Sequence, residues 1–290
     1  MDTQTLIQLK PPKTFEEQLD ILQERGLVVR DRLKAIKTLE RLNYYRFTAY
    51  ALTFKSFEKF HSGTTFENLY RHYEFDMKLR ILLLEIIEPI EIAFRTHIAY
   101  LIAHKYGPTG YRDSKNFSDE YKHIDFLQKL EQCLNNSKDP FVEHHRTKYG
   151  GNFPSWVAFE VLTFGLLSKL FSNLKTTDKK EIAKTYYPGV HFSELASWLR
   201  ALTTVRNKCA HYSRLFNQNL TDRAKIPKKY SHLCIASEKL FSVIIAIKHI
   251  STFNVWEQWY KKLEALVETY PEIDIKVIGF IPQWKTALIN

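Results

Sequence analysis

LRILLLEIIEPIEIAFRTHIAYLIA, residues 79–103, is the most apolar stretch of this chain and sets the expectation for its fold. Charged residues and a proline interrupt it, among them Glu85, Glu88, Pro89, Glu91 and Arg95. A membrane-spanning helix needs about 20 predominantly apolar residues, so this density of charge rules against a membrane span. The stretch instead predicts two core helices, residues 66–88 and 89–105, that meet at the proline.

The helical pattern continues through most of the chain after residue 66. Further helices are expected at residues 118–134, 154–174, 179–186, 193–211, 230–249 and 255–269. The tail, residues 273–284, alternates loosely and predicts a short strand or an ordered extension. Only 9 glycines and 10 prolines punctuate the chain, which favours long helices over many short strands. The predicted fold class is therefore all-α.

The first 60 or so residues carry a helical pattern of their own. After an extended lead at residues 1–13, Thr14 and Glu17 have the spacing of a capping box, and Gly26 is a helix stop. A second helix follows Asp31, and residues 54–63 are expected to be a connector. The predicted organisation is an N-terminal helical module, residues 1–62, and a larger helical domain, residues 63–290.

Charge points to an anionic partner. The net charge is +10 and the isoelectric point is near 9.3, which favours nucleic acid first and an anionic membrane surface second. Simple solubility is the alternative explanation. The three cysteines form no CxxC pair, so neither a zinc knuckle nor a disulfide framework is indicated, and a reduced cytoplasmic setting fits.

The segment RNKCAHYSRLFN, residues 206–217, carries the residues best suited to chemistry. Arg206 offers a cation for phosphate, His211 a proton carrier, and Asn207 an amide that can orient the imidazole. Asn207 and His211 are four residues apart and share a helix face, which Arg214 extends. Arg206 points about 140° away from His211 on an ideal helix, a gap that two facing copies of the helix sharing one cleft would relieve.

Arg206 is also unusual because of its neighbours. It continues the i, i+4, i+3 rhythm of Leu195, Leu199 and Leu202, which places an arginine on the core-facing stripe of its helix. An unpaired buried charge is costly, so we expect Arg206 to line a cleft or meet an anion. A snorkelling side chain or a structural ion pair is the alternative.

Four segments of the chain carry a family resemblance, and they occur in the same order as in the family that they resemble. R-N-x-x-x-H at Arg206–His211 resembles the motif of the HEPN superfamily of helical ribonucleases, and the longer string at 206–217 resembles the AbiD/AbiF type of the Abi family, bacterial phage-defence proteins. LERLNYYRFTAY (39–50), EPIEIAFRTHIAY (88–100) and IGFIPQW (278–284) are similar to other segments of that family. The resemblance covers nearly the whole chain.

The resemblance implies a HEPN-like helical bundle and metal-independent RNA cleavage by 2′-hydroxyl attack, with toxicity that arrests an infected cell. It implies that His211 is the general acid or base, that Arg206 holds the scissile phosphate, and that Asn207 orients the catalytic groups. HEPN ribonucleases pair two such motifs, which implies a homodimer. Arg214 and Asn217 belong to the Abi-type extension and are expected to contact RNA.

Further candidates have plainer alternatives. Glu91 and Arg95 form an i, i+4 pair that is either a plain salt bridge or a second shell beside the active-site helix. Tyr45 and Arg46 mix an aromatic with a cation, as base-stacking platforms do, although core packing is the stronger interpretation of that cluster. Lys228 and Lys229 belong to a basic cluster after the motif that either guides RNA or is a solvated surface.

No metal or cofactor is expected. His144 and His145 are adjacent and diverge by about 100° on a helix, so they are poor co-ligands. Nucleotide-binding and hydrolase motifs are absent from the sequence.

The leading hypothesis is an endoribonuclease toxin of phage defence. The alternatives are a non-catalytic protein that holds a structured RNA, and a sensor that acts through a protein partner. Because a toxin must be restrained, an antitoxin protein or a small RNA is an expected partner.

Overall fold

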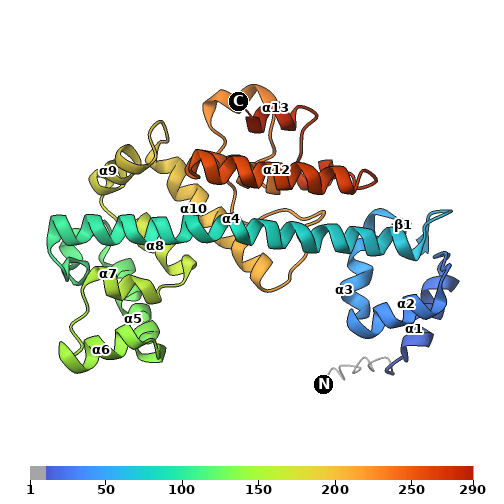
Figure 1. The fold of residues 1–290 in the computed structure, drawn as a ribbon, viewed down its shortest axis with the longest axis horizontal. Helices are drawn as coiled ribbons and strands as arrows, with labels where there is room; N and C mark the ends of the chain where they lie inside the picture. Colours follow the sequence, from blue (N-terminus) through green and yellow to red (C-terminus); the bar gives the residue numbers. More distant parts are fainter. Residues whose placement is uncertain (1–10, 290) are drawn as a thin grey trace, which may run out of the picture. The chain divides into compact units, whose positions relative to one another are not determined.

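The computed structural model describes residues 11–289 and divides into two compact units, one reaching to Met77 and one beginning at Lys78. Figure 1 shows that the chain is helical nearly throughout. Within the described residues, strands are limited to one two-stranded hairpin. This confirms the all-α fold class. None of the described helices combines the length and the apolarity that crossing a membrane requires.

The first unit is built from short elements and the beginning of a long helix. They are α1 (Phe15–Glu24), α2 (Arg32–Arg41), α3 (Tyr44–Thr48), a 3₁₀ turn (Ala49–Thr53), β1 (Lys55–Ser56), β2 (Lys59–Phe60) and the first turns of α4 (Phe66–Tyr106). Ten residues of the expected extended lead lie outside the described part of the chain, and Pro11–Lys13 belong to no helix or strand. The predicted boundary at residue 62 lies just before α4, whereas the two units divide within that helix.

Local capping sets the ends of α1 and α2 as predicted. The Thr14 hydroxyl accepts a hydrogen bond from the Glu17 backbone N–H (3.2 Å), and the Glu17 carboxylate accepts one from the Thr14 N–H (2.8 Å). Gly26 follows the end of α1 with φ 94°, a conformation that glycine adopts without steric cost. The Asp31 carboxylate accepts from the Lys34 N–H (2.9 Å) and starts α2.

The segment predicted to be a plain connector, residues 54–63, contains the β-hairpin. β1 and β2 pair antiparallel, with Lys55 opposite Phe60 and Ser56 opposite Lys59. At the turn, Phe57 has φ 55° and an almost fully exposed ring. The sequence around this turn lacks the Asn-Gly or Asp-Gly pair that marks most two-residue hairpins, which is why the strands were missed.

α4 runs without interruption from Phe66 to Tyr106, with Pro89 inside it. The prediction of two helices that meet at the proline was therefore wrong. A proline within a helix costs about 3 kcal/mol, because it removes one hydrogen bond and crowds the preceding turn. Buried residues on both sides of it offset that cost: Leu83, Ile86, Ile87, Ile90, Phe94 and Ile98.

The second unit continues from α4 through a series of helices. They are 3₁₀ turns at Gly110–Arg112 and Ser114–Asn116, α5 (Glu120–Asn136), α6 (Pro140–Lys148), α7 (Ser155–Ala158), a 3₁₀ turn (Phe159–Val161), α8 (Phe164–Asn173), α9 (Thr176–Tyr186), α10 (Phe192–Ala210), η5 (Lys228–Leu233, a 3₁₀ turn), α11 (Leu240–Ile250), α12 (Phe253–Thr269), a 3₁₀ turn (Ile275–Ile278) and α13 (Trp284–Ile289).

Two of the helices expected in this unit are broken in the structure. The helix predicted at 154–174 breaks at Leu162, because the Thr163 hydroxyl accepts from the Leu166 N–H (3.2 Å) and starts α8 afresh. The helix predicted at 230–249 breaks at Cys234, which is left-handed with φ 50°. The tail forms a 3₁₀ turn followed by α13, so the strand alternative was wrong and the alternative of an ordered extension remains. α6 was not predicted, although Pro140 stands at its first position, where proline suits a helix.

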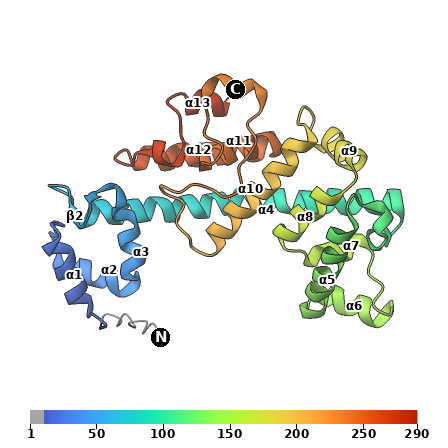
Figure 2. The same ribbon diagram turned by 180° about the vertical axis from the view of Figure 1, so that it is seen from behind.

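α10 and α12 both lie against α4. Figures 1 and 2 show α12 running beside α4. The Trp259 indole N–H of α12 donates to the Leu82 carbonyl of α4 (2.6 Å), and Lys262 pairs with Glu85. α10 packs against α8, α9 and α11, with Leu195, Leu199 and Leu202 completely buried. This packing fixes the helix that carries the predicted motif.

Candidate functional site

A cavity of about 440 Å³ in the second unit brings together residues of α4 and α10. Its lining residues are Leu84, Glu88, Glu91, Ile92 and Arg95 of α4 with Arg206 and Ala210 of α10. Glu88, Glu91 and Arg95 are spaced i, i+3, i+7, so they project from one face of α4. The cavity therefore brings together Glu91 and Arg95, which were predicted to lie beside the active site, and Arg206, which was predicted to be catalytic.

Glu91 joins two arginines from different helices. One carboxylate oxygen lies 3.0 Å from Arg95 Nη2 and the other lies 3.5 Å from Arg206 Nε. The side chains of Glu91 and Arg95 are only 10% and 12% exposed, whereas that of Arg206 is 38% exposed. Desolvated charges need such pairing, because a lone buried carboxylate is costly. Glu91 thus ties α4 to α10.

Arg95 has further contacts that hold its guanidinium in place. Arg95 Nη2 also donates to the Leu162 carbonyl at 3.1 Å, and Nη1 lies 3.9 Å from the Glu160 carboxylate. Leu162 is the extended residue at the break before α8, so this break has a specific contact with α4. No sequence motif marks Glu160 or this carbonyl, since the contacts of both depend on where the chain turns.

Arg206 does not continue the buried stripe of α10. Val205 takes that position and is completely buried, so the prediction that Arg206 stands on the core-facing stripe was wrong. The helix turns 100° per residue, and this places Arg206 at the border of the apolar face. At this border Arg206 lines a cavity and also forms an ion pair with Glu91, so the expected cleft and the alternative of a structural ion pair both occur.

Asn207 and His211 are exposed, and neither lines the cavity. Arg206 Nη1 lies 3.5 Å from the Asn207 amide oxygen, a long hydrogen bond. His211 is the C-cap residue of α10, and its backbone N–H donates to the Asn207 carbonyl (2.9 Å). In the described part of the chain, the His211 imidazole makes no hydrogen bond, including the predicted one to Asn207. The structure thus brings Arg206 and Asn207 together and leaves His211 apart.

The end of α10 fixes where His211 stands. The Ser213 N–H donates to the Lys208 carbonyl (2.8 Å) and the Tyr212 N–H to the Cys209 carbonyl (3.1 Å), the two bonds of a Schellman motif. Tyr212 takes the left-handed position of that motif, with φ 57°. Beyond it, Arg214 and Asn217 are half-buried, and Asn217 is also left-handed (φ 50°).

The basic cluster after the motif lines a second cavity of the same unit, of about 910 Å³. Lys225, Lys228 and Lys229 lie on its wall together with His249. Burial lowers the pKa of His249 to about 4, and the nearby charges of Lys229 and Lys248 add to this effect. His249 Nε2 is buried and has no hydrogen-bond partner within residues 11–289. Lys228 and Lys229 therefore face a cationic cavity distinct from the one at Arg206.

The remaining predicted RNA contacts, Tyr45 and Arg46, belong to α3 in the first unit. The Tyr45 ring is 80% exposed and meets Tyr44 edge-on, with 5.6 Å between ring centroids. Core packing, the stronger interpretation of this cluster, holds for Phe47 and Tyr50 but not for Tyr45. The ring centroids of His144 and His145, both on α6, lie 5.5 Å apart. No group of three or more potential metal ligands is present among the described residues.

One comparison with known proteins supports the Abi part of the sequence resemblance. A family model described as an Abi-like protein matches residues 37–217. The match runs from the middle of α2 to Asn217, so it includes Glu91, Arg95 and the whole segment from Arg206. Searches of curated proteins and of solved structures gave no significant match.

Proposed function

We propose, from the premise that this chain belongs to the Abi-like protein family, that it is a metal-independent endoribonuclease toxin of phage defence. The family itself indicates an abortive-infection protein. RNA cleavage, the HEPN type of the bundle and the dimer are our proposal. The observation that carries it is the Glu91–Arg206 ion pair, which holds a half-exposed guanidinium beside a cavity and five residues before an exposed histidine.

Arg206 is suited to hold a phosphate. Glu91 contacts its Nε, and Arg95 in turn contacts Glu91, so the guanidinium is positioned before any ligand arrives. A pre-positioned arginine can donate two parallel hydrogen bonds to phosphate oxygens and stabilise the extra charge of a pentacovalent transition state. Glu91 and Arg95 act here as positioning residues.

His211 is the proton carrier of the proposed reaction. As a base it removes the proton of a ribose 2′-hydroxyl, the O2′–P bond forms, and the P–O5′ bond breaks. The leaving 5′-oxygen takes up a proton from the acid form of a second imidazole. The products are a 2′,3′-cyclic phosphate and a 5′-hydroxyl. No metal ion takes part in these steps.

A homodimer supplies the missing geometry. Arg206 and His211 diverge by about 140° around one helix, and only Arg206 lines the cavity. Two copies of α10 that face each other would place the imidazole of one beside the guanidinium of the other. The two histidines then serve as base and acid.

Purified protein tests the proposal. Incubated with RNA and excess chelator, it should yield fragments with 2′,3′-cyclic phosphate and 5′-hydroxyl ends. His211→Ala and Arg206→Ala should each lower the rate by at least about 100-fold. The matched controls are His144→Ala, an exposed histidine of α6, and Arg200→Ala, an exposed arginine of α10; both should cleave normally.

The second candidate is a protein that binds RNA without cutting it. The His211 imidazole, which neither lines the cavity nor contacts Asn207, favours this reading. It would be established if the wild-type protein binds RNA in the same assay, leaves it intact, and loses binding in Arg206→Ala but not in His211→Ala.

A further inference from the structure

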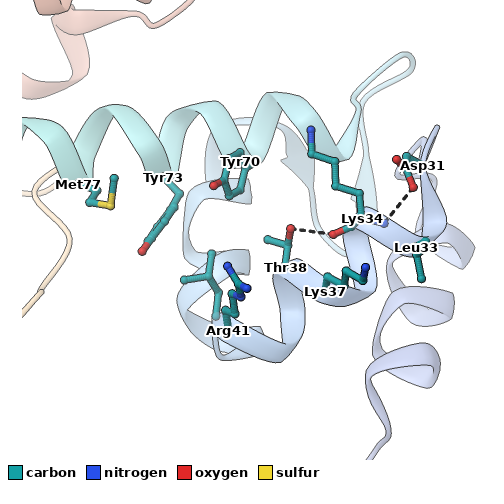
Figure 3. A pocket seen from close by; sticks show the side chains of 10 residues that line it. Asp31, Leu33, Lys34, Lys37, Thr38, Arg41, Tyr70, Tyr73 and Met77 are labelled. Atoms are coloured by element: carbon teal, nitrogen blue, oxygen red, sulfur yellow. Dashed lines mark hydrogen bonds between the residues drawn. The ribbon is translucent and has the colours of Figure 1, made fainter.

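The first unit has a groove of about 740 Å³ that none of the sequence motifs predicted. Figure 3 shows its two sides. Lys34, Lys37 and Arg41 stand on α2, and Tyr70, Tyr73 and Met77 stand on the facing part of α4. We propose that this groove binds a single-stranded segment of RNA, with the cations on the phosphates and the tyrosines against the bases.

The cationic side is built by helical spacing. Lys34, Lys37 and Arg41 follow one another at i, i+3, i+7, so they line one face of α2. All three are exposed, and within the described residues none of them forms an ion pair. By contrast, Arg32 of the same helix is paired with Asp20 (2.7 Å). Among residues 11–289, therefore, no carboxylate forms an ion pair with any of the three cations of the groove.

Among the described residues that line the groove, Asp31 is the one acid, and it caps α2. The Asp31 carboxylate accepts the hydrogen bond from the Lys34 backbone N–H that starts α2. A carboxylate that caps a helix N-terminus is stabilised there by the partial positive charge of the helix. It therefore does not compete with a phosphate for the three cationic side chains.

The opposite side offers aromatic rings held by the fold. Tyr70 and Tyr73 lie one helical turn apart, with ring centroids 6.1 Å apart and planes tilted by 40°. Tyr73 also meets Tyr50 edge-on at 5.8 Å, and Tyr70 packs against the core of the unit. Rings fixed in this way lose little entropy when a base stacks on them.

The presence of cations on one side of the groove and aromatic rings on the other indicates the class of ligand. Proteins that bind single strands combine a cationic track for the backbone with aromatic rings for successive bases. In a duplex the faces of the bases are not available for stacking on the tyrosines. Acidic side chains have no ring that could stack on them. The choice of RNA over single-stranded DNA rests on the proposed function; the binding itself does not depend on cleavage.

Binding is measured on the full-length protein with a fluorescein-labelled, roughly 12-nucleotide oligouridine that is 2′-O-methylated and so cannot be cut by 2′-hydroxyl attack. The triple variant Lys34→Gln/Lys37→Gln/Arg41→Gln should weaken binding by about tenfold or more. Its salt dependence, as the slope of log K against log salt, should fall by about 2, at roughly 0.7 per phosphate contact.

The matched control removes the same charges elsewhere in the same unit. Arg30→Gln/Lys55→Gln/Lys59→Gln also replaces two lysines and one arginine, all outside the groove. It should bind within about twofold of the wild type. Equal losses in the two triple variants would overturn the proposal, because they would show only a general effect of net charge.

Stacking of a base on the tyrosines is measured separately from affinity, by fluorescence. An oligonucleotide with 2-aminopurine in place of one base should lose fluorescence on binding the wild type. Tyr73→Leu, which keeps apolar bulk but removes the ring, should weaken binding by about fivefold or more and abolish this quenching. Thermal melts of every variant check that the unit stays folded.

Two other results would also overturn the proposal. The first is a duplex that binds as tightly as the single strand. The second is displacement of the probe by polyglutamate without quenching of 2-aminopurine fluorescence by the wild type, which would assign the groove to an acidic protein segment. Because the probe cannot be cleaved, these outcomes are independent of the endoribonuclease proposal. Loss of cleavage in His211→Ala with intact binding of the probe would separate the two sites.

Discussion

Glu91 and Arg206, from two helices far apart in the sequence, form an ion pair with 3.5 Å between Oε2 and Nε, at the wall of a cavity. The same carboxylate holds Arg95, so one buried anion stands between two guanidinium groups. This arrangement makes Glu91 a determinant both of stability and of where Arg206 points.

Replacing Glu91 by Gln should destabilise the protein by about 2 kcal/mol, because two guanidinium groups then lose the anion that they share, and one of them, Arg95, is largely desolvated. Urea unfolding of the variant measures this loss. The control is Glu257→Gln, which breaks the exposed i, i+4 pair with Lys261 and should cost less than about 0.5 kcal/mol. Equal costs for the two variants would contradict a structural role of Glu91.

Asp178 should be among the most sensitive charged residues of the second unit. It is completely buried, and it accepts hydrogen bonds from Lys105 Nζ (2.8 Å) and the Tyr106 hydroxyl (2.9 Å). Asp178→Ala removes the partner of the Tyr106 hydroxyl and one of the two carboxylate partners of Lys105, and it should cost about 2–3 kcal/mol. Glu181→Ala removes the exposed second partner of Lys105 and should cost less than about 1 kcal/mol. Thermal unfolding of both variants tests the difference.

His249 should make the protein less stable in mild acid. Burial first, and then the charges of Lys229 and Lys248, lower the pKa of its imidazole from 6.5 to about 4. Between these two values the unfolded chain binds more protons than the folded one, so stability falls as the pH drops from about 6.5 towards 4. The melting temperature measured across this range should fall less steeply for His249→Phe. An unchanged slope in that variant would show that other groups cause the acid sensitivity.

Phe57 holds a left-handed conformation (φ 55°) with its ring 98% exposed. Such a conformation costs a residue with a side chain roughly 1 kcal/mol, while the ring contributes almost no burial. Phe57→Gly should therefore stabilise the protein by about 0.5–1 kcal/mol in thermal unfolding. Phe57→Ala removes the same ring but keeps the strained backbone, and it should give no such gain.

Much of the secondary structure was predictable because its causes are local. The capping bond between Thr14 and Glu17, the stop at Gly26 and the cap at Asp31 involve residues within one turn of each other. The breaks at Leu162 and Cys234 were not predicted. At Leu162 a local cause, the Thr163 cap of α8, acts together with a distant one, because the Leu162 carbonyl also accepts a hydrogen bond from Arg95 of α4.

For the candidate site, too, the features with local causes were predictable and those that depend on distant contacts were not. The spacing of Arg206, Asn207 and His211 was readable from the sequence, as was the divergence of Arg206 from His211. The packing of α10 on the rest of the unit decided that Val205 takes the core position. It also decided that Glu91 contacts both Arg95 and Arg206. The groove in the first unit was missed although Lys34, Lys37 and Arg41 share a helical spacing, because its other half is on α4.

The sequence by itself determined the helical class, the capping of α1 and α2, and the composition of the candidate site, since periodicity, caps and motifs act over a few neighbouring residues. Only the tertiary structure decided that α4 passes through Pro89 without a break and that Glu91 joins Arg95 to Arg206. Both outcomes come from burial against distant parts of the chain. Packing free energy from such contacts outweighs a local cost of about 3 kcal/mol at the proline, and it sets which charges must meet.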